Sequence, residues 1–158
     1  MIKINLVVVG KNKHDWLTQG IRHYQKLVKK YQVDLEFNVV KDEKIDQKKD
    51  SELVLDKEAE RIFKYLSKDS YRIVLDVSGK ILSSEELANL LRNKLNTGKS
   101  EFVFIIGGPL GVSEKIVKNC HFRLCLSGMT FTHQLSRLIL SEQIFRAFSI
   151  IKGDKYHK

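Results

Sequence analysis

The sequence predicts an α/β protein with one parallel sheet and helices on both of its faces. Short apolar and β-branched runs alternate along the chain with segments whose apolar residues recur at helical spacing, from 2–9 to 133–151. Strands that alternate with helices are typical of parallel pairing. The 158 residues show no internal repeat and no low-complexity linker, which favours a single domain over 1–158.

The first elements are expected to be a strand, a helix and a second strand. Residues 2–9 are β-branched and apolar and stop at a glycine, as a buried strand does. Residues 15–31 carry apolar side chains at helical spacing, and we expect Trp16 and Ile21 on the buried face. Residues 33–39 alternate between apolar and polar, which indicates a strand with one solvated face near a sheet edge.

The middle of the chain begins with a charged stretch, residues 41–50, which is interpreted as a loop or as the start of a solvated helix. A strand at 71–75 is expected to end in a loop over 76–80. Ser83 followed by Glu86 fits a capping box, which marks the start of another helix. The other predicted elements, in chain order, are a helix over 51–66, the end of a helix near Gly98, a strand over 102–106, a short helix over 113–119, a strand over 122–126 and a helix over 133–151.

The composition limits the class of protein. Hydrophobic residues make up 42% and charged residues 30%, which is typical of a soluble globular domain. No apolar run has the length of a membrane span and residues 1–9 lack the features of a signal peptide, so we expect a cytoplasmic protein. Cys120 and Cys125 are not spaced as CxxC and no histidine cluster accompanies them, so we expect buried free thiols and no metal.

The net charge of +9 favours a polyanionic partner such as nucleic acid, although a lysine-rich surface without a partner is about equally compatible with it. If RNA is the partner, basic side chains early in the chain are candidates for phosphate contacts, with a solvated helix face as the alternative. These candidates are Lys11, Lys13, Arg22, Lys26, Lys29 and Lys30.

A glycine-rich turn, residues 107–111, follows the predicted strand at 102–106. It lacks the Gly-Lys-Ser/Thr ending of a P-loop and the spacing of the dinucleotide-binding GxGxxG. A tight turn that needs positive φ explains some of these glycines, and close approach of the backbone to a ligand is an equally good explanation. Ligands of open α/β sheets bind beyond the carboxyl ends of the strands, which is where this turn is predicted to lie.

A second loop, residues 126–131, joins the predicted strand at 122–126 to the last helix. It offers the hydroxyls of Ser127 and Thr130 beside the apolar side chain of Phe131. An apolar wall with a few polar groups suits a flat heterocycle. An ordinary connection, with a threonine as the cap of the helix, is the alternative.

The predicted last helix, 133–151, is apolar nearly all round, which indicates burial on more than one side and favours a symmetric dimer. His133, Arg137 and Ser141 recur at intervals of four and share one stripe of this helix. We expect Arg137 either to pair with a carboxylate across an interface or to face a phosphate or a base.

Four segments carry a family resemblance: Phe-Ile-Ile-Gly-Gly-Pro-Leu-Gly from 104, Leu-Ser-Gly-Met-Thr-Phe-Thr-His-Gln from 126, Glu-Gln-Ile-Phe-Arg-Ala-Phe from 142, and the terminal Tyr-His-Lys. In this order they resemble the RlmH family of the SPOUT superfamily. Members of that family methylate nitrogen 3 of a pseudouridine in helix 69 of 23S ribosomal RNA, in the assembled ribosome. The resemblance covers essentially the whole chain and is weakest over 41–67.

The resemblance implies a C-terminal trefoil knot that holds S-adenosylmethionine, within about residues 71–158. General topology rules make knots very rare, so periodicity alone would not have suggested one. Carried over by position, the cofactor contacts are Leu75, Gly107, Leu126, Ser127, Gly128, Met129, Thr130 and Phe131.

The resemblance also implies a homodimer without metal, acting on 23S rRNA within the ribosome. The tail residues Tyr156, His157 and Lys158 are then expected on the substrate side, either within one chain or across the dimer. His133, Arg137 and His157 are the catalytic candidates, because the reacting nitrogen must lose a proton, and Arg137 is also a candidate for substrate binding. The sequence does not rank these three.

Two positions depart from the family pattern. Thr132 stands where proline is common, and we expect it to cap the helix instead. Leu110 stands where some relatives carry a polar or acidic residue. Two other functions remain open: a non-catalytic RNA- or nucleotide-binding module on the same fold, and a SPOUT methyltransferase that acts on tRNA.

Overall fold

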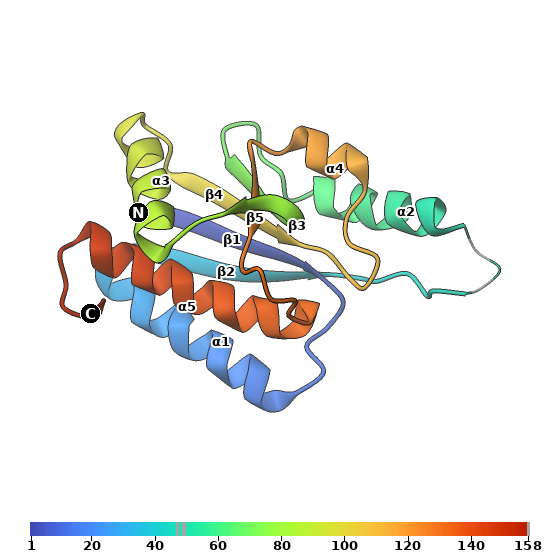
Figure 1. Ribbon diagram of the computed structural model, residues 1–158, viewed down its shortest axis with the longest axis horizontal. Coiled ribbons are helices and arrows are strands. Elements are labelled where there is room, and N and C mark those ends of the chain that lie inside the picture. The colour runs from blue at the N-terminus through green and yellow to red at the C-terminus, as the bar shows by residue number, and fades with distance from the viewer. Residues whose placement is uncertain (47, 49, 158) are drawn as a thin grey trace.

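The structure, a computed structural model, describes residues 1–46, 48 and 50–157 and contains one five-stranded sheet (Figure 1). Its neighbouring strands are all parallel, in the order β2-β1-β4-β3-β5, which confirms the predicted fold class. β2 lies at an edge, as its alternating pattern predicted. The strands are β1 (Ile2–Val9), β2 (Val33–Val40), β3 (Tyr71–Ile81), β4 (Glu101–Ile106) and β5 (Phe122–Cys125).

Helices cover both faces of this sheet, as predicted (Figure 1). On one face α1, α3 and α5 enclose the larger core, and on the other α2 and α4 enclose a smaller one around Val7, Val74 and Ile105. The helices are α1 (Asp15–Leu27), the 3-10 turn η1 (Val28–Tyr31), α2 (Ser51–Phe63), α3 (Ser84–Asn96), α4 (Glu114–Asn119) and α5 (His133–Ile151). The described residues between 41 and 50 form a loop, one of the two predicted alternatives.

The apolar character of α5 is largely explained within one chain. α5 contacts both α1 and α3 and rests on the sheet (Figure 1). Every residue of α5, all of which the structure describes, is buried or half-buried. A helix flanked on three sides needs apolar residues around most of its circumference. The predicted dimer therefore does not follow from this helix alone.

The prediction that Trp16 lies on the buried face of α1 is wrong. Leu17 and Ile21 are buried, whereas Trp16 is 56% exposed. Consecutive helical residues are about 100° apart, so the stripe that buries Leu17 turns Trp16 to the flank of the helix. There its ring stacks on His14, with the two centroids 5.5 Å apart.

The predicted loop over 76–80 is also wrong, because β3 continues to Ile81. Leu75 and Lys80 both pair with Leu124 of β5, and the residues between them form an irregularity in the ladder. Gly79 makes this possible: a Cβ there would lie 2.6 Å from the carbonyl oxygen of Arg123. The capping box of Ser83 and Glu86 at the start of α3 is confirmed.

Candidate active site

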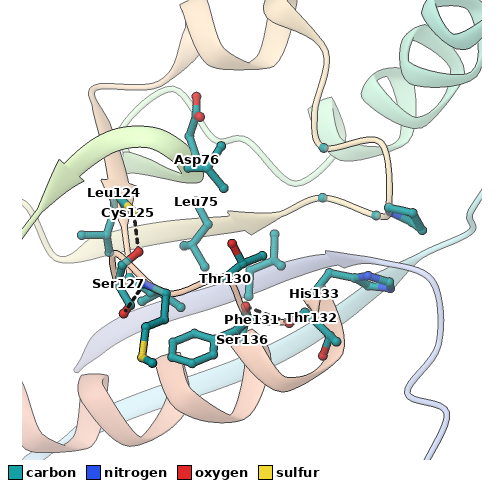
Figure 2. A pocket seen from close by; sticks show the side chains of 18 of the residues that line it. Leu75, Asp76, Leu124, Cys125, Ser127, Thr130, Phe131, Thr132, His133 and Ser136 are labelled. Atoms are coloured by element: carbon teal, nitrogen blue, oxygen red, sulfur yellow. Dashed lines mark hydrogen bonds between the residues drawn. The ribbon is translucent and has the colours of Figure 1, made fainter.

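A cavity of about 530 Å³ lies at the carboxyl ends of β3, β4 and β5 and is bounded by the N-terminal turn of α5 (Figure 2). The glycine turn at 107–111 and the loop at 126–132 both contribute to its wall. These are the two loops that the sequence singled out. A volume in this range suits a nucleoside-sized ligand.

The cavity brings together seven of the eight residues predicted to contact a cofactor, and Gly128 is the one that does not line it. Further lining comes from residues the sequence reasoning did not select for this role, such as Ile106, Leu124 and Ser136. Leu110, one of the two departures from the family pattern, also lines the cavity and is 39% exposed. The seven are Leu75, Gly107, Leu126, Ser127, Met129, Thr130 and Phe131.

The backbone of the glycine turn is folded too tightly for a side chain at Gly107. A Cβ there would lie 2.2 Å from the carbonyl oxygen of Gly111. Gly111 itself adopts φ +81°, and its N–H donates to the carbonyl of Gly108 at 3.0 Å. The explanation that the turn requires glycine is therefore confirmed. The turn also lines the cavity, and close approach of its backbone to a ligand stays a prediction.

The loop before α5 is held by its own hydroxyls. The Ser127 hydroxyl accepts a hydrogen bond from the Met129 N–H at 3.0 Å, and the Thr132 hydroxyl accepts one from the Leu135 N–H at 3.1 Å. Thr132 is thus the N-cap of α5, as expected at the position where proline is common. Figure 2 shows Thr130 of this loop and Leu75 of β3, and both line the cavity.

His133 is the catalytic candidate that lines the cavity. Burial lowers the pKa of its imidazole, and the positive charges of Arg137 and Lys13 lower it further. The ring is therefore neutral at pH 7 and has a free nitrogen lone pair. A neutral histidine at the edge of a nucleoside-sized cavity is suited to accept a proton from a substrate.

Arg137 does not reach the cavity, although it shares a stripe of α5 with His133. Its side chain is completely buried. One guanidinium nitrogen donates to the carbonyl of Val9 at 2.6 Å and another to the side chain of Asn12 at 2.9 Å. Burial lowers its pKa to about 10. Among the described residues Arg137 forms no salt bridge, although the nearby charge of Asp42 partly offsets the effect of burial on its pKa. Its two hydrogen bonds fasten α5 to the end of β1 and to the loop that follows.

Tyr156 and His157 lie beyond the other end of α5, and their side chains contact residues of α3 and α5. His157 Nε2 lies 2.6 Å from a carboxylate oxygen of Glu85, and its Nδ1 lies 3.2 Å from Arg146. Arg146 in turn donates to Glu142 at 2.9 Å, the predicted structural pair of this helix. Lys158, also predicted to contact substrate, lies outside the described residues.

Asp76 lines the cavity, yet the sequence reasoning assigned it only to a loop. Its carboxylate accepts from the backbone N–H of Ser78 at 2.8 Å and from Arg123 at 2.7 Å. Burial by itself raises the pKa of Asp76, but these two partners together lower it below its ordinary value. Its position directly after the predicted strand at 71–75 was the available signal, although β3 in fact continues through it.

Within 1–46, 48 and 50–157, no three His, Cys, Asp or Glu side chains are grouped so as to hold a metal ion. No helix among the described residues is long and apolar enough to cross a membrane. Both cysteines are free thiols, and burial raises the pKa of Cys120 to about 11.

Residues 2–157 match the family described as "Predicted SPOUT methyltransferase". The chain belongs to the SPOUT methyltransferase family. It is 47% identical to "Ribosomal RNA large subunit methyltransferase H" of Halothermothrix orenii, over 99% of this chain and 100% of that protein. With the protein of the same name from Alkaliphilus oremlandii it shares 44% identity, over 99% of this chain and 100% of that one.

Among solved structures, the fold is similar to that of a probable methyltransferase from Bordetella pertussis Tohama I. The TM-score is 0.56 at 11% identity, over 92% of this chain and 93% of that one. This structural likeness concerns the fold alone. The match over residues 2–157 establishes the family of this chain.

Proposed function

We propose that this SPOUT methyltransferase transfers a methyl group from S-adenosylmethionine to nitrogen 3 of a pseudouridine in helix 69 of 23S rRNA, within the assembled ribosome. The observation that carries the proposal is the cavity at the strand ends, which gathers seven residues that the family resemblance assigns to the cofactor. The names of the relatives from Halothermothrix and Alkaliphilus support ribosomal RNA as the substrate. Since ribosomes are cytoplasmic, the proposal also implies a cytoplasmic protein.

The residues of the cavity fit this cofactor. Its apolar wall includes Leu75, Ile106 and Leu126, which can enclose a flat adenine ring. The bare backbone at Gly107 allows close approach of the ligand, where a Cβ would clash. The family resemblance also implies a trefoil knot within about residues 71–158. Such a knot would hold the turn at 107–111 and the loop at 126–131 in fixed positions relative to each other.

In this proposal the cofactor supplies a methyl group on a sulfonium. When bound, it would give this methyl group to nitrogen 3 of the pseudouridine, and the imide proton would have to leave nitrogen 3. His133 accepts this proton, because its lowered pKa keeps it neutral and it lines the cavity. Arg137 acts through position: its charge disfavours protonation of His133, and it holds the end of β1.

We further propose that the active unit is a homodimer in which the tail of one chain completes the cavity of the other. Val77 and Met129 line the cavity and are 84% and 76% exposed, and Ile81 nearby is 56% exposed. Exposed apolar side chains grouped in this way favour an interface. His157 contacts Arg146, which lies 13 helical residues or about 20 Å beyond His133, so the tail lies far from the cavity of its own chain.

Methyl transfer to ribosomes tests the proposed function directly. Labelled S-adenosylmethionine would be incubated with intact ribosomes from cells that lack this enzyme, and the rRNA digested for mass spectrometry. Free 23S rRNA, bulk tRNA and ribosomes without the pseudouridine serve as controls. We expect label on pseudouridine from intact ribosomes alone. Label on tRNA would show that tRNA, and not ribosomal RNA, is the substrate. No label on any RNA, despite measured cofactor binding, would favour the non-catalytic binding module.

A further inference from the structure

We propose that Trp16 and His14 form a stacking platform for an unpaired RNA base beside the methylated nucleotide, and that Lys11 and Lys13 contact the adjoining phosphates. We call these four residues the platform. The inference rests on the proposed function, because the RNA substrate brings the base to this part of the molecule. It assigns RNA contact to an aromatic pair that the reaction itself does not use.

The aromatic pair is flat, exposed and available for stacking. The rings of His14 and Trp16 are 5.5 Å apart between centroids and only 15° from parallel. Trp16 remains 56% exposed, and among the described residues His14 is the only aromatic side chain that stacks on it. A stacked pair that keeps an indole in solvent leaves apolar ring surface that a nucleobase can cover.

The loop that carries the platform is held rigidly to α5. The side chain of Gln134 accepts from the backbone N–H of Lys13 at 3.1 Å and donates to the carbonyl of Lys11 at 3.0 Å. Between them, the side chain of Asn12 accepts from the buried Arg137 at 2.9 Å. Two side chains of one helix therefore position this short loop, so a base can bind without ordering it first.

The same contacts place the platform beside the cavity. Gln134, which holds the loop, directly follows His133, which lines the cavity. The charge of Lys13 contributes to the lowered pKa of His133, so the two side chains lie within electrostatic range. An RNA strand whose target nucleotide lies at His133, facing the cofactor in the cavity, would pass this loop with a neighbouring nucleotide.

Charge favours RNA over a second copy of the chain as the occupant. Lys11 and Lys13 are exposed, and among the described residues neither forms an ion pair. Asp15 is the acidic neighbour, and it lies in the first turn of α1, where it complements the helix dipole. A second copy also carries a net charge of +9, so its approach would bring like charges together, whereas phosphates would neutralise the lysines.

Fluorescence gives a direct readout, because Trp16 is the single tryptophan of the chain. The protein would be titrated at low salt with a short oligouridylate and with an RNA duplex of the same length. Stacking of an unpaired base predicts quenching by the single strand and little change with the duplex, whose bases already stack on each other. Equal responses to both, or none to either, would overturn the platform.

Kinetics on ribosomes give the second readout. Trp16→Leu keeps an apolar side chain but cannot stack, and we expect KM for ribosomes to rise about 5- to 150-fold, with kcat and cofactor affinity unchanged. Trp16→Phe should keep most of the wild-type KM. The double variant Lys11→Gln, Lys13→Gln should lower the slope of log KM against log salt by about 1.5. Matched controls on α2, Leu53→Ala and Lys57→Gln, should change neither quantity.

The outcomes separate the platform from the proposed function. An unchanged KM for Trp16→Leu on ribosomes that the wild type methylates would refute the platform alone. Dissociation of a wild-type dimer into monomers by Trp16→Leu, seen by analytical ultracentrifugation, would show that a second copy covers Trp16 and would also refute it. Quenching by single-stranded RNA in a protein that never methylates ribosomes would keep the platform and refute the proposed function.

Discussion

The two ends of α5 carry different kinds of site. At the N-terminal end His133 lines a cavity among backbone loops, and burial together with neighbouring cations keeps it neutral. At the C-terminal end His157 lies in an ion-pair network with Glu85 and Arg146, and none of these three residues lines that cavity. The first end can enclose a ligand, and the second presents side chains held by their partners. Under the proposed function each end supplies only part of the active site.

The difference indicates how the helix is used. Its buried stripe, including Arg137 and Ser141, fixes the helix to the rest of the fold. That rigidity keeps His133 about 20 Å from Arg146, 13 helical residues further on, which contacts His157. The cavity and the tail are therefore held apart within one chain. A symmetric dimer removes this problem, because it can place one end of α5 in one chain against the other end in its partner.

The largest expected effect comes from Gly107→Val at the N-terminal end. A side chain there clashes with the backbone at Gly111, so the turn must move and cofactor affinity should fall by about 100-fold or more. Titration calorimetry with S-adenosylmethionine measures this. Gly98→Ala is the control: it replaces a turn glycine with positive φ that does not line the cavity and whose Cβ would meet no atom within 4 Å, so its cofactor affinity should match the wild type. If both variants bound S-adenosylmethionine with equal affinity, this cavity would not be its binding site.

His133→Gln should lower kcat by about 10²- to 10⁴-fold while cofactor affinity stays unchanged. The wild-type rate should rise with pH through an apparent pKa below the ordinary 6.5 of histidine and then level off, since the neutral ring is the active form. The variant should lack this rising limb. His23→Gln, on the exposed side of α1, serves as the control. A variant that retains the wild-type pH profile would exclude His133 as the base.

At the C-terminal end His157→Ala should lower kcat by about 10- to 100-fold, because loss of one positioned group misaligns the substrate. Cofactor affinity should not change, which is the reverse of the pattern expected for Gly107→Val. Stopped assays with ribosomes measure kcat and calorimetry measures cofactor affinity, so together they distinguish the effect of His157→Ala from that of Gly107→Val. A tail variant that loses cofactor affinity would contradict the division of roles along α5.

The smallest effect is expected from Arg137→Met, in the stripe between the two ends. It leaves the carbonyl of Val9 and the side chain of Asn12 without their donor, which should cost about 1–3 kcal/mol of unfolding free energy. Urea denaturation measures this loss. If the rate of methyl transfer fell in a variant that is still folded under the assay conditions, the result would fit an arginine that positions the loop and His133. Wild-type stability would show that these two hydrogen bonds do not hold the fold.

The fold and most of the cavity could be predicted from the sequence, for a local reason. The periodicity of strands and helices depends on residues that are close together in the sequence. The glycine turn at 107–111 and the loop at 126–131 each follow directly after a buried strand. Parallel strands bring such loops to one edge of the sheet, so their convergence follows from the fold class.

What could not be predicted depends on contacts between distant segments. Arg137 bonds to Val9, 128 residues away, and the helical stripe shows which way a side chain faces but not what it meets. Trp16 has the chemistry of a core residue, and only the packing of α1 leaves it exposed. The continuation of β3 past Leu75 required its pairing with β5, which the local polar sequence conceals.

Mixing two inactive variants tests most directly the claim that the two ends of α5 act together across a dimer. Gly107→Val lacks the cavity and His157→Ala lacks the tail, so a mixed dimer would retain one complete site. After dissociation and reassociation in equal amounts, we predict recovery of about a quarter of wild-type methyl transfer, since half the dimers are mixed and each has one site of two. No recovery, with mixed dimers shown to form, would contradict the account and place the cavity and the tail in separate functions.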